Sequence, residues 1–216
     1  MRTGVELAAL LRRRGVADGR VLAAIAAVPR ELFVPEELRR RAYDDRALPI
    51  GHGQTISQPF MVATICAALE LSADGRVLDV GTGSGYQAAV LAELAAEVVT
   101  IERVPELADR ARDTLARAGY DRVEVRLGDG TLGVPERAPF EGIAVAAAAP
   151  AVPETLYAQL AHGGRVVVPV GSLRDQWLEV VVRGADGPEV ARSVPCRFVP
   201  LVGAAGFDEP STRRLR

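Results

Sequence analysis

Residues 76–94 read RVLDVGTGSGYQAAVLAEL. A short run of β-branched and apolar residues ends in glycine, a glycine-rich turn follows, and a segment with helical spacing comes next. A strand joined to a helix in this way is typical of an open α/β sheet, which binds its ligands at the carboxyl ends of its strands. We therefore expect the turn at 81–85 to lie beside a ligand.

The same alternation of strand and helix continues along the chain. The sequence predicts helices over 85–96, 105–118 and 152–161, and strands over 76–81, 97–102, 123–129, 140–147 and 165–171. Strands that are continuously apolar and separated by helices indicate a parallel sheet covered on both faces.

Two further strand-like runs, 177–183 and 189–202, are joined only by the short turn GADGPE. This turn is too short for a crossover helix, so the two runs should pair antiparallel. Ahead of the sheet, helical spacing occurs at 5–14, 19–27, 31–45 and 59–71. The predicted fold class is α/β: a doubly wound, mostly parallel seven-stranded sheet with N-terminal helices and one antiparallel strand.

The composition is that of a globular domain without an unusual charge. The chain has 216 residues, which fits one domain, and its net charge of −2 gives no basic field for nucleic acid. No apolar run suits a signal peptide or a membrane span. Cys66 and Cys196 lie in apolar runs without metal-ligand spacing, which indicates reduced thiols, no metal site and the cytoplasm.

We expect a single domain over 1–207 and a disordered tail over 208–216. Within the domain, residues 1–72 supply the N-terminal helices and the loop 51–60, and residues 76–203 form the sheet core.

Acidic residues at three successive strand ends mark a candidate cofactor site. Asp79 stands at the glycine turn, Glu102 ends the second strand, and Asp129 ends the third. An acid at the second strand end can accept hydrogen bonds from ribose hydroxyls, and a cleft lined by carboxylates suits a positively charged ligand better than a phosphate. The alternative is that these are ordinary polar residues at strand ends.

The glycine spacing is G-x-G-x-G, with Tyr86 in the place where the dinucleotide fingerprint needs glycine. The pattern therefore favours S-adenosylmethionine, whose product is S-adenosyl-L-homocysteine, over a dinucleotide. The candidate cofactor-binding residues are Asp79, Gly81, Thr82, Gly83, Ser84, Gly85, Glu102, Asp129 and Gly130.

Four segments resemble one known family. They are VPRELFVPEELRRRAYDDRALPIGHGQTISQPFMVA (28–63), VLDVGTGSGYQAAVLAEL (77–94), RLGDGTLGVPERAPFEGI (126–143) and RFVPLVG (197–203). Through them the chain resembles the protein-L-isoaspartate O-methyltransferases from about residue 18 to residue 203, and TISQP and RFVPL are the most specific parts. The resemblance implies a Rossmann-like methyltransferase fold and methyl transfer to the free α-carboxylate of L-isoaspartyl residues in proteins and peptides.

The resemblance also implies that Ser57 is the catalytic residue. The substrate-binding residues that it implies are Thr55, Ile56, Ser57, Val199, Pro200 and Leu201. No base is needed, because an α-carboxylate with a pKa of roughly 3.5 is already ionised at neutral pH and the leaving thioether is neutral. From the residues alone, Ser57 could instead cap the helix that begins near Pro59.

Two positions depart from the family pattern. Val134 stands where tryptophan is usual, and Ala146 stands where threonine is usual. Both substitutions are expected to change the wall of the cleft and thereby the peptide preference, without changing the class of reaction.

Other functions stay open. One is aspartyl O-methylation of a single dedicated biosynthetic peptide, and another is a cofactor-binding module without turnover. Methylation of a nucleic acid base is disfavoured because AAAAP at 146–150 offers no polar grip on an amine, and a nicotinamide oxidoreductase is disfavoured by Tyr86. The expected partners are isoaspartyl proteins and peptides, with no nucleic acid and no membrane, and the chain is expected to be a monomer.

Overall fold

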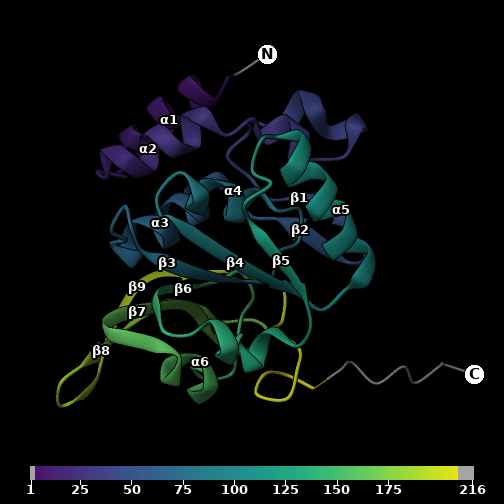
Figure 1. Ribbon diagram of the computed structural model, residues 1–216. Helices are drawn as coiled ribbons and strands as arrows, with labels where there is room; N and C mark the ends of the chain where they lie inside the picture. Colours follow the sequence, from purple (N-terminus) through teal and green to yellow (C-terminus); the bar gives the residue numbers. More distant parts are fainter. Residues whose placement is uncertain (1–2, 209–216) are drawn as a thin grey trace, which may run out of the picture.

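A seven-stranded sheet with helices against both faces forms the centre of the computed structural model, which describes residues 3–208 (Figure 1). The strands lie in the order β5-β4-β3-β6-β7-β8-β9. Their bounds are β3 Arg76–Val80, β4 Glu97–Glu102, β5 Glu124–Leu127, β6 Phe140–Val145, β7 Leu160–Gly171, β8 Gln176–Gly184 and β9 Gly187–Cys196.

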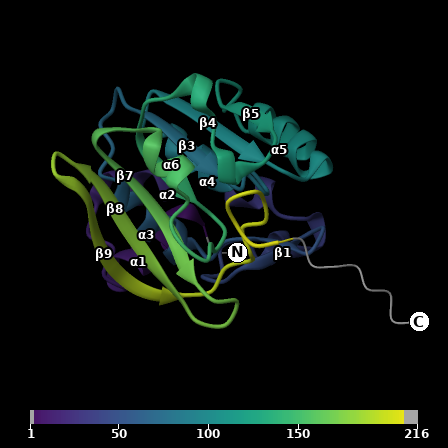
Figure 2. The ribbon, with the colours of Figure 1, turned by 90° about the horizontal axis from the view of Figure 1, so that it is seen from below.

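The strands from β5 across to β7 are parallel, and β8 runs antiparallel to both of its neighbours, β7 and β9 (Figure 2). The predicted α/β class with one reversed strand near the edge is therefore confirmed. The order of strands reverses between β3 and β6, which is the point where open α/β sheets bind ligands.

Within residues 3–208, five α-helices lie on one face of the sheet and one lies on the other. Helices α1 Gly4–Arg13, α2 Gly19–Ala27, α3 Pro59–Leu69, α4 Tyr86–Ala92 and α5 Pro105–Arg117 share one apolar core with that face, and α6 Glu154–Ala158 belongs to the core of the opposite face. Helix α1 begins at a capping box in which Thr3 and Glu6 bond to each other's backbone, and α3 and α5 begin with proline. These features fix the starts of helices that the apolar spacing predicts.

The helical region expected over 31–45 is not one α-helix. The chain forms two short 3₁₀ helices, η1 Arg30–Phe33 and η2 Glu36–Arg41. Pro35 lies between them, and a proline both lacks the backbone donor and keeps the preceding residue extended. The break brings Arg30 into the interior, where it is fully buried.

Residues 48–56 form a hairpin that the sequence analysis treated as a loop. Strands β1 Leu48–Gly51 and β2 Gln54–Ile56 pair antiparallel around His52 and Gly53, both of which have a positive φ. A two-residue turn of that hand matches the twist of a hairpin, although histidine in the first position is unusual. After the hairpin, only Ser57 and Gln58 lie between β2 and the start of α3.

Two boundaries near the C-terminus differ from the prediction. Helix α6 ends at Ala158 and β7 begins at Leu160, so the glycines at 163 and 164 lie inside a strand and not after a helix. Strand β9 ends at Cys196, so RFVPL is not part of the last strand. RFVPL instead crosses the carboxyl edge of the sheet, where Ala148 and Pro200 form an isolated parallel bridge.

Within residues 3–208, no helix combines the length and the apolar character that crossing a bilayer requires. Apart from Asp208, the tail predicted over 208–216 lies outside the described residues.

Candidate functional site

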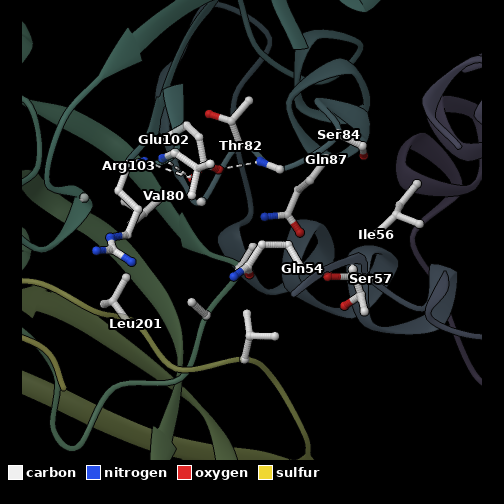
Figure 3. A pocket seen from close by; sticks show the side chains of 18 of the residues that line it. Gln54, Ile56, Ser57, Val80, Thr82, Ser84, Gln87, Glu102, Arg103 and Leu201 are labelled. Carbon is white, nitrogen blue, oxygen red and sulfur yellow. Dashed lines mark hydrogen bonds between the residues drawn. The ribbon is translucent and has the colours of Figure 1, made fainter. Parts of the chain in front are cut away.

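A pocket of about 310 Å³ opens at the carboxyl ends of β3, β4 and β6 (Figure 3). It is bounded by the hairpin and its following segment, by the glycine turn, by the residues after β4, and by the segment after β9. The lining residues are His52, Gln54, Thr55, Ile56, Ser57, Val62, Val80, Gly81, Thr82, Gly83, Ser84, Tyr86, Gln87, Ile101, Glu102, Arg103, Val104, Gly130, Ala146, Ala147, Val199, Pro200, Leu201 and Val202.

The glycine turn forms one wall of the pocket. Gly81, Gly83 and Gly85 all have a positive φ, which other residues adopt only with strain. Gly81 and Gly83 line the pocket, whereas Gly85 does not. A Cβ at Gly85 would lie 3.1 Å from Leu115 of α5, so this glycine permits close packing of the turn against the helix.

Glu102 presents a fixed carboxylate to the pocket. It ends β4 and is 6% exposed. Its Oε2 accepts from the Gly83 amide at 2.8 Å, and its Oε1 accepts from the amides of Arg103 and Val104 at 2.9 and 3.0 Å. Because an ionised carboxylate offers about four lone-pair sites, capacity remains for a hydroxyl donor from a ligand.

Asp79 lies beneath the pocket and does not line it. Its Oδ1 accepts from Gln87 Nε2 and its Oδ2 from Thr100 Oγ1, both at 2.8 Å, and the side chain is fully buried. Burial raises the pKa of Asp79 to about 6, against the opposing effect of these two hydrogen bonds. The side chain that reaches the pocket in its place is Gln87, which the sequence analysis missed.

Asp129 also lies away from the pocket. It caps the 3₁₀ turn η3, Gly130–Leu132, through hydrogen bonds to Thr131, and its other oxygen accepts from the amide of Ala204 at 2.8 Å. Burial raises the pKa of Asp129, but these hydrogen bonds outweigh it and leave the pKa below its usual value. The carboxylate thereby ties the C-terminal segment to the sheet. Of the pair Asp129 and Gly130, only Gly130 lines the pocket.

All six predicted substrate-binding residues line the pocket, from two sides. Thr55, Ile56 and Ser57 come from β2 and the turn after it, and 199–201 come from the segment after β9. That segment is held to the end of β6 because Ala148 donates to the carbonyl of Val199 at 2.8 Å and accepts from Leu201 at 2.7 Å. The structure thus brings together two segments that lie more than 140 positions apart.

Ser57 is not the cap of α3. The N-cap position belongs to Gln58, whose side chain makes no capping hydrogen bond and instead donates to the carbonyl of Asp45. The capping interpretation of Ser57 is therefore wrong. In Figure 3 the Ser57 side chain lies at the edge of the pocket, beside Gln54 and Ile56.

Arg30 anchors the backbone of Ser57 from behind. Its Nη2 donates to the carbonyl of Ser57 and its Nε to the carbonyl of Ala42, both at 2.8 Å. The guanidinium also lies 4.4 Å from the centroid of the Tyr86 ring. Burial lowers the pKa of Arg30, with Tyr86 opposing the shift. Nothing in the sequence around Arg30 indicates this role.

A second cavity of about 430 Å³ adjoins the first. It lies between the segment before α3 and the chain after β9, and its lining residues are Ala47, Thr55, Ser57, Gln58, Met61, Ala146, Pro195, Cys196, Arg197, Phe198 and Val199. Thr55, Ser57, Ala146 and Val199 line both cavities. Ser57 therefore stands where the two cavities meet.

The two departures from the family pattern have different positions. Ala146 lines both cavities, as expected of a residue in the cleft wall. Val134 is 3% exposed, belongs to the core on the α6 face, and lines neither cavity, so the expectation that it changes the cleft wall is wrong.

No group of three or more His, Cys, Asp or Glu side chains within residues 3–208 is placed to hold a metal ion. Burial raises the pKa of both thiols, that of Cys196 to about 11. Neither cysteine is therefore a ready nucleophile at neutral pH.

Comparison with known proteins gives broad matches. Residues 3–206 match the model of a family described as "Protein-L-isoaspartate(D-aspartate) O-methyltransferase (PCMT)". A protein-L-isoaspartate O-methyltransferase of Anaeromyxobacter dehalogenans is 59% identical over 199 residues, which cover 91% of this chain and 95% of the relative. One of Methanoculleus marisnigri is 53% identical over 197 residues, which cover 91% and 90%.

A solved structure from Plasmodium falciparum has the same fold over nearly the whole chain. It is described as a candidate protein-L-isoaspartate O-methyltransferase in complex with S-adenosyl-L-homocysteine. The TM-score is 0.81 at 26% sequence identity, and the match covers 94% of this chain and 99% of that one.

Proposed function

The chain belongs to the protein-L-isoaspartate(D-aspartate) O-methyltransferase family, and we propose that it methylates the free α-carboxylate of L-isoaspartyl residues in damaged proteins and peptides. The methyl donor is S-adenosylmethionine. The observation that carries this proposal is the position of Ser57 at the junction of two cavities, one suited to the donor and one open to a peptide.

The first cavity fits the donor in size and in chemistry. Its volume of about 310 Å³ lies at the lower end of the range for small-molecule sites, roughly 300–1,000 Å³. Gly81, Gly83 and Gly130 leave their part of the wall free of side chains. Glu102, held rigidly by three backbone amides, offers its remaining lone pairs to ribose hydroxyls.

The residues around Ser57 have a positioning task and not an acid–base task. S-adenosylmethionine supplies, when bound, a methyl group on a positively charged sulfur. The attacking carboxylate is ionised at neutral pH, so the protein has no proton to remove. The neutral Ser57 hydroxyl can donate to the carboxylate and orient it without neutralising the charge that the reaction consumes.

The second cavity suits an extended peptide. One side is the segment 195–199, where β9 ends at Cys196 and the chain leaves the sheet, so that it can offer main-chain groups to a substrate. An isoaspartyl residue runs its chain through the side-chain carbonyl, so its α-carboxylate hangs free beside the backbone. Recognition of that kink through main-chain contacts allows many peptide sequences as substrates.

Repair follows from the ester without further work by the protein. The neighbouring backbone nitrogen displaces methanol and closes a succinimide, which water reopens partly to normal aspartate. We further propose one methyltransferase domain over 1–207, a monomer, a cytoplasmic location, and partners that include neither nucleic acid nor membrane. These expectations rest on the sequence.

The test is methyl transfer from labelled S-adenosylmethionine to matched peptides that contain either aspartate or isoaspartate. We expect several isoaspartyl peptides of unrelated sequence to be methylated and their aspartyl counterparts not. Equal methylation of both forms would reject the repair function. Activity on one natural peptide only would favour the dedicated biosynthetic enzyme instead.

A further inference from the structure

Gln87 carries a buried oxygen that has no partner within the described residues. It is the second residue of α4 and is 6% exposed, and its side chain lines the first cavity. Nε2 donates to Asp79, whereas Oε1 accepts no hydrogen bond. A buried acceptor without a donor destabilises a protein, so an orphaned atom at the wall of a ligand pocket points to a donor on the ligand.

Asp79 determines which end of the amide faces the pocket. An ionised carboxylate only accepts hydrogen bonds, and the two oxygens of Asp79 accept from Gln87 Nε2 and Thr100 Oγ1. A flipped amide would place two acceptors against each other. The oxygen of Gln87 is therefore held toward the cavity. Figure 3 shows the amide of Gln87 pointing into the space between Glu102 and Ser57.

The position along the pocket indicates which part of the donor meets this oxygen. Gly130 lies after β5, Glu102 at the end of β4, and Gln87 on the helix after β3, nearer the junction at Ser57. If Glu102 receives the ribose, the amino acid part of the cofactor extends toward β3 and Gln87. Its ammonium is both a hydrogen-bond donor and a cation, and the buried charge of Asp79 behind the amide favours a cation there.

We propose that Gln87 Oε1 accepts a hydrogen bond from the α-ammonium of the cofactor's amino acid part, and that Asp79 does not contact the ammonium but fixes the Gln87 amide from behind. The assignment rests on the proposed function. The contact is made by an amide in an otherwise apolar helix and not by Asp79, which does not reach the pocket. Gln87 is then a residue that positions the sulfur-bearing chain relative to Ser57.

The experiment compares two ligands by calorimetry. S-adenosyl-L-homocysteine contains the amino acid part, and 5′-methylthioadenosine shares its adenosine and thioether but lacks the ammonium and carboxylate. In Gln87→Leu we expect affinity for the first to fall by roughly tenfold or more, since a charge-assisted hydrogen bond is lost, and affinity for the second to stay within about twofold. An equal loss for both ligands, or no loss for either, would overturn the assignment.

Thr100→Val is the matched control. It removes the other hydrogen bond to Asp79 and the bond to the Thr82 hydroxyl, both made by a buried residue that does not line the pocket, and it retains Gln87. We expect its ratio of affinities for the two ligands to match that of the unchanged protein. A shift in this ratio as large as that of Gln87→Leu would show that the charge of Asp79 is the determinant and would refute the direct contact.

A test on the ligand side needs no variant that must fold. The unchanged protein should bind a desamino analogue of S-adenosyl-L-homocysteine at least about tenfold more weakly than the parent compound. Equal affinity would refute the ammonium contact while leaving the methyltransferase function in place. Failure of the unchanged protein to bind S-adenosyl-L-homocysteine at all would refute the proposed function and this assignment together.

Discussion

Replacing Arg30 tests whether the backbone of Ser57 must be anchored for catalysis. Arg30→Met keeps a stem of similar length and removes the guanidinium. The carbonyls of Ala42 and Ser57 then lose their donors, and the ring of Tyr86 loses the cation that lies 4.4 Å from its centroid. The backbone at Ser57 is thereby released without any change to the serine itself.

The expected loss of stability follows from these contacts. The buried carbonyl of Ala42 left without a donor costs about 1–3 kcal/mol, the half-buried carbonyl of Ser57 costs less, and removal of a buried cation returns part of that sum. We expect unfolding free energy to fall by about 2–4 kcal/mol, which in a chain of this size lowers Tm by on the order of 10 °C. Turnover on an isoaspartyl peptide should fall as well, since the Ser57 hydroxyl loses its fixed orientation.

Arg14→Met is the control. Arg14 also lies over an aromatic ring, that of Phe60, and pairs with Asp45, but its side chain is 41% exposed and does not contact Ser57. Because the side chain of Asp45 is only 8% exposed, loss of Arg14 should cost about 1–3 kcal/mol of stability, but it should leave turnover unchanged. Thermal unfolding and steady-state kinetics on both variants decide the matter. An Arg30→Met protein that melts lower yet turns over at the normal rate would refute the anchoring role, and unchanged melting would refute the energy estimate.

Three further predictions concern single side chains. Ser57→Ala should lower turnover by roughly 10- to 1000-fold with little change in Tm, because the hydroxyl positions substrate and caps no helix; normal turnover would remove its catalytic role. Glu102→Gln should weaken binding of S-adenosyl-L-homocysteine by about tenfold or more in calorimetry, and unchanged affinity would rule out the ribose contact. The third concerns pH. Burial raises the pKa of Asp79 to about 6 from 3.8, so the carboxyl group binds its proton more tightly in the folded protein than in the unfolded chain. The contribution of Asp79 to the free energy of unfolding is therefore lost as the pH rises through about 6. The free energy of unfolding of the unchanged protein relative to Asp79→Asn should therefore fall by about 1 kcal/mol between pH 5 and pH 7 in denaturant titrations, and a difference that stays constant with pH would contradict the buried carboxylate.

The central strands could be predicted because a strand that is buried on both faces is a short, continuous run of apolar residues. Helices of the same sheet are longer and show a different spacing of apolar residues. The prediction of 76–81 and 97–102 matches β3 and β4 to within one residue. The hairpin at 48–56 gave no such signal. Its turn depends on a positive φ at His52. A positive φ is expected at glycine, so a histidine in this place gives no sign of the turn.

Site residues could be predicted where their position at a strand end determines their role. They could not be predicted where their role depends on a contact with a distant segment of the chain. The glycine turn and Glu102 are fixed by their places at strand ends. Asp129 has an equivalent place, but its carboxylate is taken by Ala204, 75 positions further on. Gln87 and Arg30 were missed for a related reason. Gln87 lies in an otherwise apolar helix and Arg30 in a charged segment, and only the packed structure shows what surrounds each of them.

The hydrogen bonds of Asp129 also bear on the chemical lifetime of the chain itself. In an Asp-Gly pair, the glycine nitrogen can attack the side-chain carboxyl and rearrange the backbone. At Asp129 and Gly130 that attack is opposed, because donors from Thr131 and Ala204 hold the carboxylate. The Asp-Gly pairs at 74–75 and 186–187 lie instead in turns where the aspartate is exposed. Spontaneous isomerisation should therefore collect in those turns and spare the carboxylate that keeps the last segment of the pocket in place.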